Sequence, residues 1–273
     1  MTDGTAEYRL GIIGTGVMGR ALLNAAIRSK VLSAGEVITS DVSPACRLEA
    51  EGFGCTATED NREVVEHSEA LLVAVKPQII REVLVDLRDT FRSGQLLISI
   101  AAGVSIETLR EAVGSAPRIV RVMPNICCTV AEAASAYAVG RSVSDEQAHF
   151  VETLLGAAGE AVRVDETLLD AVTGLAGSGP AFAAIFIEAL ADGGVKAGLS
   201  RPEAQRLAAQ TVLGAARWML EHEDSSPAQL KNMVTSPGGT TIFGIAALEG
   251  RAFRAAVMEA VVVAAERSKE LGG

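Results

Sequence analysis

The chain has 273 residues, of which 49% are hydrophobic and 21% charged, the composition of a globular protein with room for two domains. The net charge of −10 argues against nucleic acid or an acidic membrane surface as a partner, because both favour basic patches. The apolar runs at 71–75 and 255–265 are too short to cross a membrane, no signal peptide is visible, and the four cysteines form no Cys-x-x-Cys motif, so we expect a cytoplasmic protein with reduced thiols.

Apolar runs alternate with helical patterns in the first half of the chain. Strands rich in Val, Ile and Leu that alternate with amphipathic stretches predict a mostly parallel, doubly wound sheet covered by helices on both faces. The predicted strands are 9–13, 37–40, 71–75, 96–100, 118–122, 134–139 and 161–164. The predicted helices between them are 18–30, 44–51, 78–91, 105–113 and 145–158.

The pattern changes near residue 164, where strand signals end. The helices predicted beyond this point are 166–175, 180–197, 201–222, 227–234, 240–249 and 251–270. We therefore predict an α/β domain over residues 7–163 and an all-α domain over residues 164–273. The helix after Pro180 has apolar residues on nearly every face, so we expect the helical domain to bury itself against a second copy.

A glycine-rich motif stands between the first predicted strand and the first predicted helix. Gly14 suits a tight turn, Gly16 lets a pyrophosphate approach the backbone, and Gly19 lets helix and strand pack closely. The positive end of the helix dipole faces the phosphates. The α/β domain is therefore predicted to be a Rossmann domain, and its phosphate loop comprises Gly14, Thr15, Gly16, Val17, Met18 and Gly19.

Asp41 ends the second predicted strand, about 20 residues after this motif. A carboxylate there can accept hydrogen bonds from the adenosine ribose hydroxyls, and it repels a 2′-phosphate. No Arg or Lys stands directly beside Asp41, and Arg47 follows one helical turn later. The sequence therefore favours NADH over NADPH.

Two further segments close the third and fourth predicted strands: Ala74, Val75, Lys76 and Pro77, and then Ile100, Ala101, Ala102 and Gly103. Ligands of doubly wound sheets lie at the carboxyl ends of the strands, so both segments are predicted to border the dinucleotide. Small residues at 101–103 leave room for a flat ring. Lys76 is either a phosphate or carboxylate contact or a surface lysine.

An unusual turn precedes the helix predicted at 240–249. Pro237 fixes its own φ, and the two glycines that follow permit a tight turn. Thr240 and Thr241 then stand where a helix begins, next to peptide N–H groups without helical partners. This pattern predicts either a small-anion site with two hydroxyls or a helix cap.

Several of these segments resemble pyrroline-5-carboxylate reductases. Matching segments are G-T-G-V-M-G (14–19), A-V-K-P (74–77), A-V-T-G-L-A-G-S-G-P-A-F (171–182) and A-L-A-D-G-G-V-K-A-G-L (189–199), and S-P-G-G-T-T-I (236–242) is typical of that family. The resemblance spans essentially the whole chain. It implies reduction of (S)-1-pyrroline-5-carboxylate to L-proline, the last step of proline biosynthesis, with NADPH or NADH. It also implies a helical domain through which subunits interlock as homodimers, which often assemble further.

The same resemblance implies roles for individual residues. It places Asn61, Ala74–Pro77 and Ile100–Ala102 beside the cofactor. The substrate carboxylate is expected at Ser236, Gly238, Gly239, Thr240 and Thr241, with Thr241 as the catalytic residue near the imine nitrogen and Asn125 as a further substrate contact. A protonated cyclic imine needs orientation and a hydrogen bond, not a strong general acid. The sequence shows no metal-ligand spacing and no Ser-His-Asp pattern, so no metal is expected.

The chain departs from the family pattern in two places. Ile126-Cys127-Cys128 stands where the family usually has a Thr-Pro pair, and Asp41-Val42 stands where many members carry residues suited to a 2′-phosphate. Two other functions stay open at this point. One is a related β-hydroxyacid-type dehydrogenase, for which Lys196 would be the general base. The other is a protein that binds NAD(H) without turnover.

Overall fold

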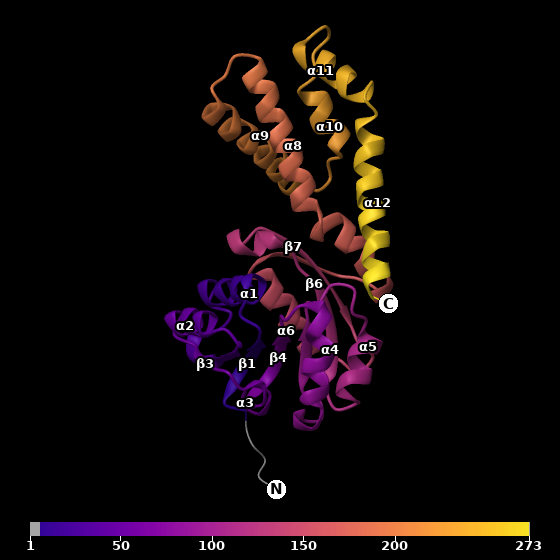
Figure 1. The fold of residues 1–273 in the computed structure, drawn as a ribbon. Helices are drawn as coiled ribbons and strands as arrows, with labels where there is room; N and C mark the ends of the chain where they lie inside the picture. The colour runs from indigo at the N-terminus through magenta and orange to yellow at the C-terminus, as the bar shows by residue number, and fades with distance from the viewer. Residues whose placement is uncertain (1–5, 273) are drawn as a thin grey trace. The chain divides into compact units, whose positions relative to one another are not determined.

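The computed structural model describes residues 6–272, and their contacts form two compact units. The first unit comprises the residues up to Ser178 together with those from Val262 onward. The second unit is Gly179–Val261. Figure 1 shows that the sheet lies in the first unit and that the second consists of helices joined by short connections.

The first unit is built on an eight-stranded sheet with the order β3-β2-β1-β4-β5-β6-β7-β8. Neighbouring strands are parallel except β6 and β7, which pair antiparallel. The order reverses direction between β1 and β4, as in a Rossmann sheet. The strands are β1 (Tyr8–Ile13), β2 (Val37–Ser40), β3 (Thr56–Thr58), β4 (Ser68–Val73), β5 (Leu96–Ser99), β6 (Arg118–Met123), β7 (Ala133–Val139) and β8 (Gly159–Arg163).

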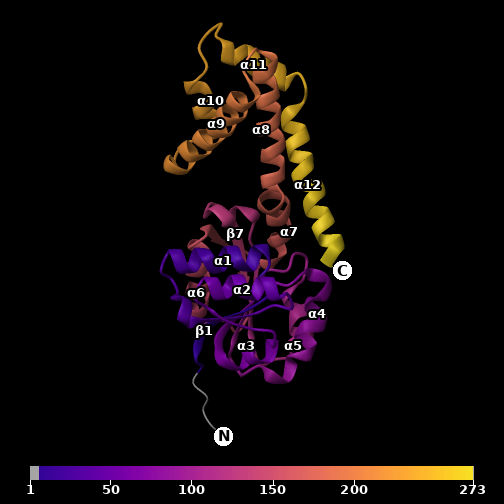
Figure 2. The same cartoon turned by 60° about the vertical axis from the view of Figure 1, so that its left-hand side comes forward.

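Helices cover both faces of this sheet, which confirms the predicted fold class (Figures 1 and 2). One apolar core joins Leu22 of α1 and Val151 of α6 to the sheet. The other joins Val64 of α3, Leu84 of α4 and Leu109 of α5 to the opposite face. The helices of this unit are α1 (Val17–Arg28), α2 (Pro44–Gly52), α3 (Asn61–His67), α4 (Pro77–Asp86), α5 (Ile106–Val113), α6 (Asp145–Gly156) and α7 (Leu169–Val172).

The second unit has a small core and much exposed apolar surface. Ala191 of α8 packs with Ala204 and Ala208 of α9, and little else in this unit is fully buried. Ile185 on α8 is 66% exposed and Phe243 on α11 is 73% exposed. The helices are α8 (Gly179–Lys196), α9 (Arg201–Glu221), α10 (Pro227–Met233), α11 (Thr240–Glu249) and α12 (Phe253–Gly272), the last of which continues into the first unit.

One helical stretch, Glu166–Lys196, is long and apolar enough to span a membrane by length and composition alone. This corrects the expectation that no segment reaches that length. The stretch escapes notice in the sequence because Glu188, Asp192 and several glycines divide its apolar residues into short runs. A π-helical turn, Thr173–Gly177, interrupts it, and it carries Glu188 and Asp192.

The last strand ends at Arg163, beside the change of pattern near residue 164. The compact units part later, after Ser178, because α7 packs on the sheet with Leu169 fully buried. Buried Arg121 lies 3.6 Å from a carboxylate oxygen of Glu166 and 3.5 Å from one of Asp170. Ser268 of α12 donates a hydrogen bond of 2.7 Å to Asp170. The division into residues 7–163 and 164–273 stays a prediction.

Candidate active site

The three glycines of the phosphate loop have different surroundings. Gly14 has a φ of +93°, and a Cβ there would lie 3.0 Å from the backbone of Ala74. A Cβ on Gly19 would lie 2.1 Å from the carbonyl oxygen of Gly14. A Cβ on Gly16 would meet no protein atom within 4 Å, so the space beside Gly16 is open. Packing therefore requires Gly14 and Gly19, whereas Gly16 leaves room for a ligand.

Helix α1 begins in a way that suits an anion. Its N-cap is Gly16, which supplies no side-chain hydrogen bond. The hydrogen bond from the Arg20 N–H to the Gly16 carbonyl, 3.0 Å, starts the helical series. The N–H groups of the three residues before Arg20 therefore have no acceptor within the helix, and the dipole adds positive potential there. This helix start fits the pyrophosphate of a dinucleotide.

The carboxyl ends of four neighbouring strands are joined by backbone hydrogen bonds. Gly14 donates to the Ser40 carbonyl at 2.8 Å, Ala74 to Ile13 at 2.8 Å, and Ile100 to Val73 at 3.2 Å. These links place the predicted cofactor residues along one edge of the sheet. The residues concerned are Gly14–Gly19, Asp41, Asn61, Ala74–Pro77 and Ile100–Ala102.

Asp41 lies at the end of β2 with both carboxylate oxygens bonded to protein groups. Oδ2 accepts hydrogen bonds from the backbone N–H of Thr15 at 2.8 Å and from its hydroxyl at 3.3 Å. Oδ1 accepts from the N–H of Ser43 at 2.8 Å. Arg47 donates from Nη1 to the carbonyls of Asp41 at 2.8 Å and Val42 at 3.3 Å. The carboxylate therefore connects the phosphate loop to the start of α2.

Other predicted cofactor residues occupy the same edge. The amide oxygen of Asn61 accepts a 2.7 Å hydrogen bond from the Ser40 hydroxyl, which places this side chain at the end of β2. Lys76 is exposed and directly precedes α4, which starts at Pro77. Ala101 is buried beyond the end of β5. The structure thus brings these residues to the edge that holds the glycine motif.

Asn125 follows β6 and joins two loops. It is 7% exposed. Its Oδ1 accepts a hydrogen bond of 3.1 Å from the N–H of Cys127, and its Nδ2 donates one of 3.0 Å to the carbonyl of Ala176 in the π-helical turn. The unusual Ile126-Cys127-Cys128 sequence forms a 3-10 turn over Ile126–Val130, and burial raises the pKa of the Cys128 thiol to about 11.

The second unit contains the predicted substrate turn. Gly239 donates to the Ser236 carbonyl at 3.1 Å, and Gly238 has a φ of +67°, so Ser236–Gly239 form a type II turn with proline at its second position. Helix α11 starts at Thr240 after Gly239, which provides no side-chain cap. Its first N–H groups therefore lack helical acceptors, and Thr240 and Thr241 stand beside them. The exposed Ile242, Phe243 and Leu248 are spread around α11.

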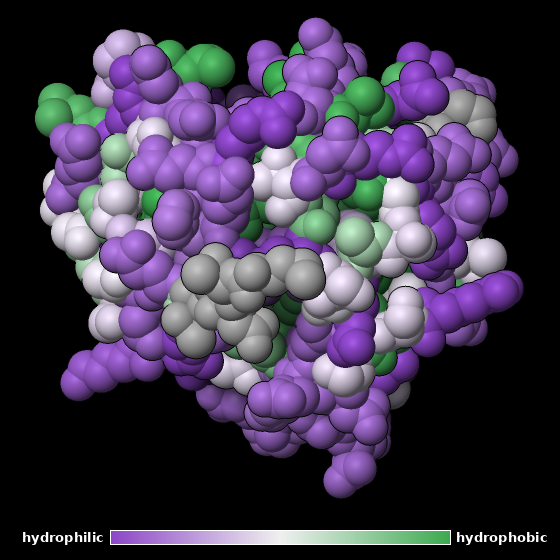
Figure 3. All heavy atoms as spheres, turned by 90° about the horizontal axis from the view of Figure 1, so that it is seen from below, coloured by the Kyte–Doolittle hydropathy of each residue, from purple (hydrophilic) through white to green (hydrophobic). Residues whose placement is uncertain are grey.

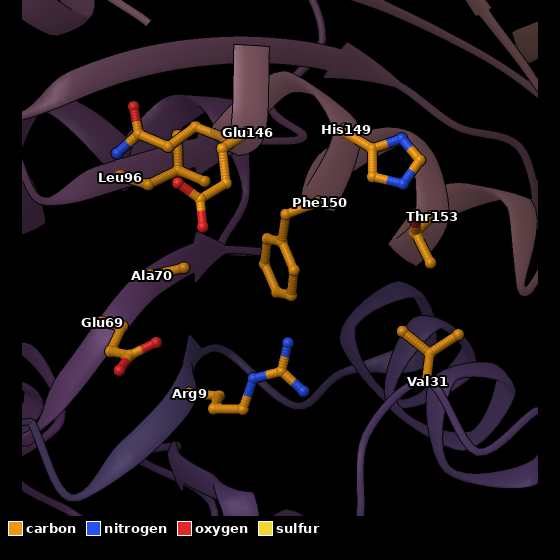
Figure 4. Close-up of a pocket in the computed structure, with 10 residues that line it drawn as sticks. Arg9, Val31, Glu69, Ala70, Leu96, Glu146, His149, Phe150 and Thr153 are labelled. Atoms are coloured by element: carbon orange, nitrogen blue, oxygen red, sulfur yellow. The ribbon is translucent and has the colours of Figure 1, made fainter. Parts of the chain in front are cut away.

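A separate hollow of about 460 Å³ lies where β1, β4 and β5 begin (Figure 4). The face seen from below in Figure 3 is mostly hydrophilic. Arg9 stands 5.8 Å above the ring of Phe150 and pairs with Glu36 at 3.5 Å. The amide of Gln147 bonds to Arg118 and to the Gly94 carbonyl. This hollow lies at the edge of the sheet opposite the glycine motif.

Among residues 6–272, no three or more His, Cys, Asp or Glu side chains are grouped so as to hold a metal ion. One buried polar network was not predicted from the sequence. It joins Arg121 to Glu166, Asp170 and Ser268, and the backbone N–H of Ile106 also donates to Glu166 at 2.6 Å. The signal that could have found it is an arginine in the middle of an apolar strand, because a charge there requires partners.

A Rossmann sheet with an open phosphate loop, followed by a helical region, is an arrangement typical of nicotinamide-dinucleotide-dependent oxidoreductases. Comparisons with known proteins agree with this class. Residues 9–103 match the domain family described as NADP oxidoreductase, coenzyme F420-dependent. Residues 166–271 match the family described as pyrroline-5-carboxylate reductase dimerisation.

Individual relatives cover nearly the whole chain. The pyrroline-5-carboxylate reductase of Methanosarcina acetivorans is 48% identical over 267 residues, covering 97% of this chain and 98% of that protein. The structure of the Coxiella burnetii enzyme has a TM-score of 0.92 and 33% identity, covering 98% and 99% of the two chains. A Plasmodium falciparum pyrroline carboxylate reductase with NADP bound has a TM-score of 0.87 and 34% identity, covering 99% and 100%. This chain therefore belongs to the pyrroline-5-carboxylate reductase family.

Proposed function

We propose that this protein reduces (S)-1-pyrroline-5-carboxylate to L-proline with NADH or NADPH, the last step of proline biosynthesis. One observation carries the proposal: the type II turn at Ser236–Gly239 leads into an uncapped helix with two threonines, in a chain similar to pyrroline-5-carboxylate reductases along its whole length. The turn suits a small carboxylate, and the first unit suits a dinucleotide.

The residues at the carboxyl edge of the sheet fit a nicotinamide dinucleotide. The open space beside Gly16 and the uncapped N–H groups of α1 support binding of the pyrophosphate there. We propose that the rest of the cofactor lies along the carboxyl end of β2, which Asp41 follows, and along Asn61, Ala74–Pro77 and Ile100–Ala102. When bound, the nicotinamide supplies the hydride that reduces the imine carbon.

The substrate would be held by the second unit. Ser236, Gly238, Gly239 and Thr240 are proposed to bind its carboxylate through peptide N–H groups and hydroxyls. Thr241 is proposed to hydrogen-bond the imine nitrogen and hold its proton in place. Asn125 stays a proposed substrate contact, since one of its two Nδ2 hydrogens is not used by the bond to Ala176. Because a cyclic imine is basic enough to be protonated in water, these residues need only to orient it.

The assembly proposed is a homodimer formed through the helices beyond residue 164, which then pairs into larger assemblies. The exposed apolar residues of α8 and α11 support it, because an isolated chain would leave them in water. The match of residues 166–271 to a dimerisation domain includes the long apolar stretch, which supports subunit association as the role of its surface. A cytoplasmic location is proposed from the cysteines, all four of which are free.

The test is to mix the purified protein with pyrroline-5-carboxylate and either NADH or NADPH and to follow the loss of nicotinamide absorbance. We expect cofactor oxidation with L-proline formed in equal amount. If neither cofactor is oxidised, the proposed reaction is wrong. Oxidation of 3-hydroxy acids without imine reduction would instead support the dehydrogenase alternative.

A further inference from the structure

We propose that Arg47 selects NADPH by binding its 2′-phosphate, and that Asp41 is a positioning residue for the phosphate loop, not a contact for the ribose. The inference rests on the proposed function only in that the carboxyl edge of the sheet binds a nicotinamide dinucleotide. It differs from the expectation drawn from the sequence, in which Asp41 itself meets the ribose hydroxyls and favours NADH.

The bonding of Asp41 supports a positioning role. Three hydrogen bonds reach its carboxylate, two from Thr15 and one from the N–H of Ser43. Thr15 is fully buried and stands between the two glycines that shape the phosphate loop. Hydrogen bonds to a carboxylate are roughly twice as strong as those between neutral groups. Asp41 therefore fixes the loop that both NADH and NADPH must bind.

Arg47 belongs to α2, and its guanidinium group is held at the end of β2. The adenosine ribose takes this position in a Rossmann fold. Nη1 is occupied by the carbonyls of Asp41 and Val42, and the side chain is only 21% exposed. The N–H groups on Nε and Nη2 remain for an anion. A guanidinium fixed in this way binds a phosphate without losing further rotamer freedom, which an exposed lysine could not do.

Two neighbours complete the site. Glu59 places a carboxylate oxygen 3.6 Å from Nη2 of Arg47, beyond normal hydrogen-bond distance, and its side chain is 80% exposed. This carboxylate can therefore be displaced into water by a stronger anion. Ser43 is the N-cap of α2, yet its side chain makes no capping hydrogen bond, so the hydroxyl is available. Arg47 and Ser43 thus favour a 2′-phosphate, and Glu59 opposes it.

The experiment measures dissociation constants of NADPH and NADH by fluorescence titration of the full-length protein without any imine. We expect Arg47→Gln to weaken NADPH binding about tenfold or more and to change NADH binding less than about twofold. Glu59→Gln should strengthen NADPH binding about threefold, since it removes the competing charge. Asp41→Asn should weaken both cofactors by a similar factor and leave their ratio within about threefold of the wild type.

Arg110→Gln is the matched control, because Arg110 pairs with Glu107 near the end of α5, away from β2. It should change neither constant. The role given to Asp41 would be overturned if Asp41→Asn did not weaken cofactor binding at the phosphate loop and instead shifted the ratio of the two dissociation constants about tenfold toward NADPH. Equal loss of both cofactors in Arg47→Gln, or no loss, would overturn the role given to Arg47. Should Arg47→Gln fail to fold, Glu59→Gln decides, and an unchanged NADPH constant there counts against the proposal.

These titrations also separate this inference from the proposed reaction. Selective binding without reduction of pyrroline-5-carboxylate would contradict the proposed function and leave the roles of Arg47 and Asp41 intact. Binding of neither dinucleotide would overturn both.

Discussion

Thr241 is the single side chain on which the proposed chemistry depends most directly, because it would hold the proton of the imine nitrogen. We expect Thr241→Ala to lower kcat by about two orders of magnitude, the usual effect of removing one hydrogen bond to a reacting group. NADH binding should stay unchanged, since the cofactor residues belong to the first unit. Steady-state kinetics and cofactor titration measure both. Thr211→Ala on α9 is the control, and equal activity in the two variants would remove Thr241 from the mechanism.

Two buried thiols are expected to lower the stability of the fold at alkaline pH. Burial raises the pKa of Cys55 and of Cys128 from 9.0 to about 11. Between these values the unfolded chain releases thiol protons that the folded chain keeps, so the free energy of unfolding falls as the pH rises. We expect the urea midpoint to drop between pH 8.5 and about 10.5 by more in the wild type than in a Cys55→Ala, Cys128→Ala double variant. Equal drops in the urea midpoint of the two proteins would contradict the raised pKa of these thiols.

At the level of elements, the β1–α1 loop allows structural and ligand effects to be separated. Gly19→Ala places a Cβ against the Gly14 carbonyl, and we expect it to cost about 1–3 kcal/mol of stability. Gly16→Ala meets no protein atom, so its unfolding temperature should stay within about 2 °C of the wild type while cofactor affinity falls. Thermal unfolding without cofactor and dinucleotide titration distinguish the two. A stable Gly19→Ala protein with normal affinity would contradict this assignment.

The sequence predicts most elements but misses β3 and α3, although it predicts the equally short α10. Strand β3 has only three residues, and α3 has no apolar residues apart from the adjacent Val64 and Val65, so neither shows a periodic pattern. Their stability comes from distant partners: β3 pairs with β2, and Val64 of α3 packs so closely on Gly11 that a Cβ there would lie 2.6 Å from it. Such contacts are not local in the sequence.

The same distinction applies to the site. The spacing of the glycines and of Asp41 fixes their place at the edge of a Rossmann sheet, so their positions follow from the pattern. The direction of the Asp41 carboxylate does not follow from it, because Thr15, which donates to Oδ2, is 26 residues away in the sequence. Likewise, nothing near Asn125 in the sequence indicates that its amide binds Ala176, 51 residues away.

At the level of the whole molecule, the exposed apolar helices predict assembly. We expect the wild-type protein to sediment as a dimer or a multiple of it. Ile185→Asp should shift it toward monomer, because a charge cannot be buried unpaired at an interface. Leu48→Asp is the control, since Leu48 is an exposed apolar residue of the first unit. A monomeric wild type at micromolar concentration would contradict the proposed homodimer.

Helix α12 begins in the second unit and ends in the first, where Ser268 is buried and bonded to Asp170. The consequence concerns the order of synthesis. A ribosome completes the sheet by residue 163, yet the partner of Asp170 emerges almost a hundred residues after Asp170 itself. During synthesis, the first unit therefore cannot form the bond between Asp170 and Ser268 until the whole helical region has been made. A chain cut short before Val262 would leave the first unit incomplete, even though every strand is present.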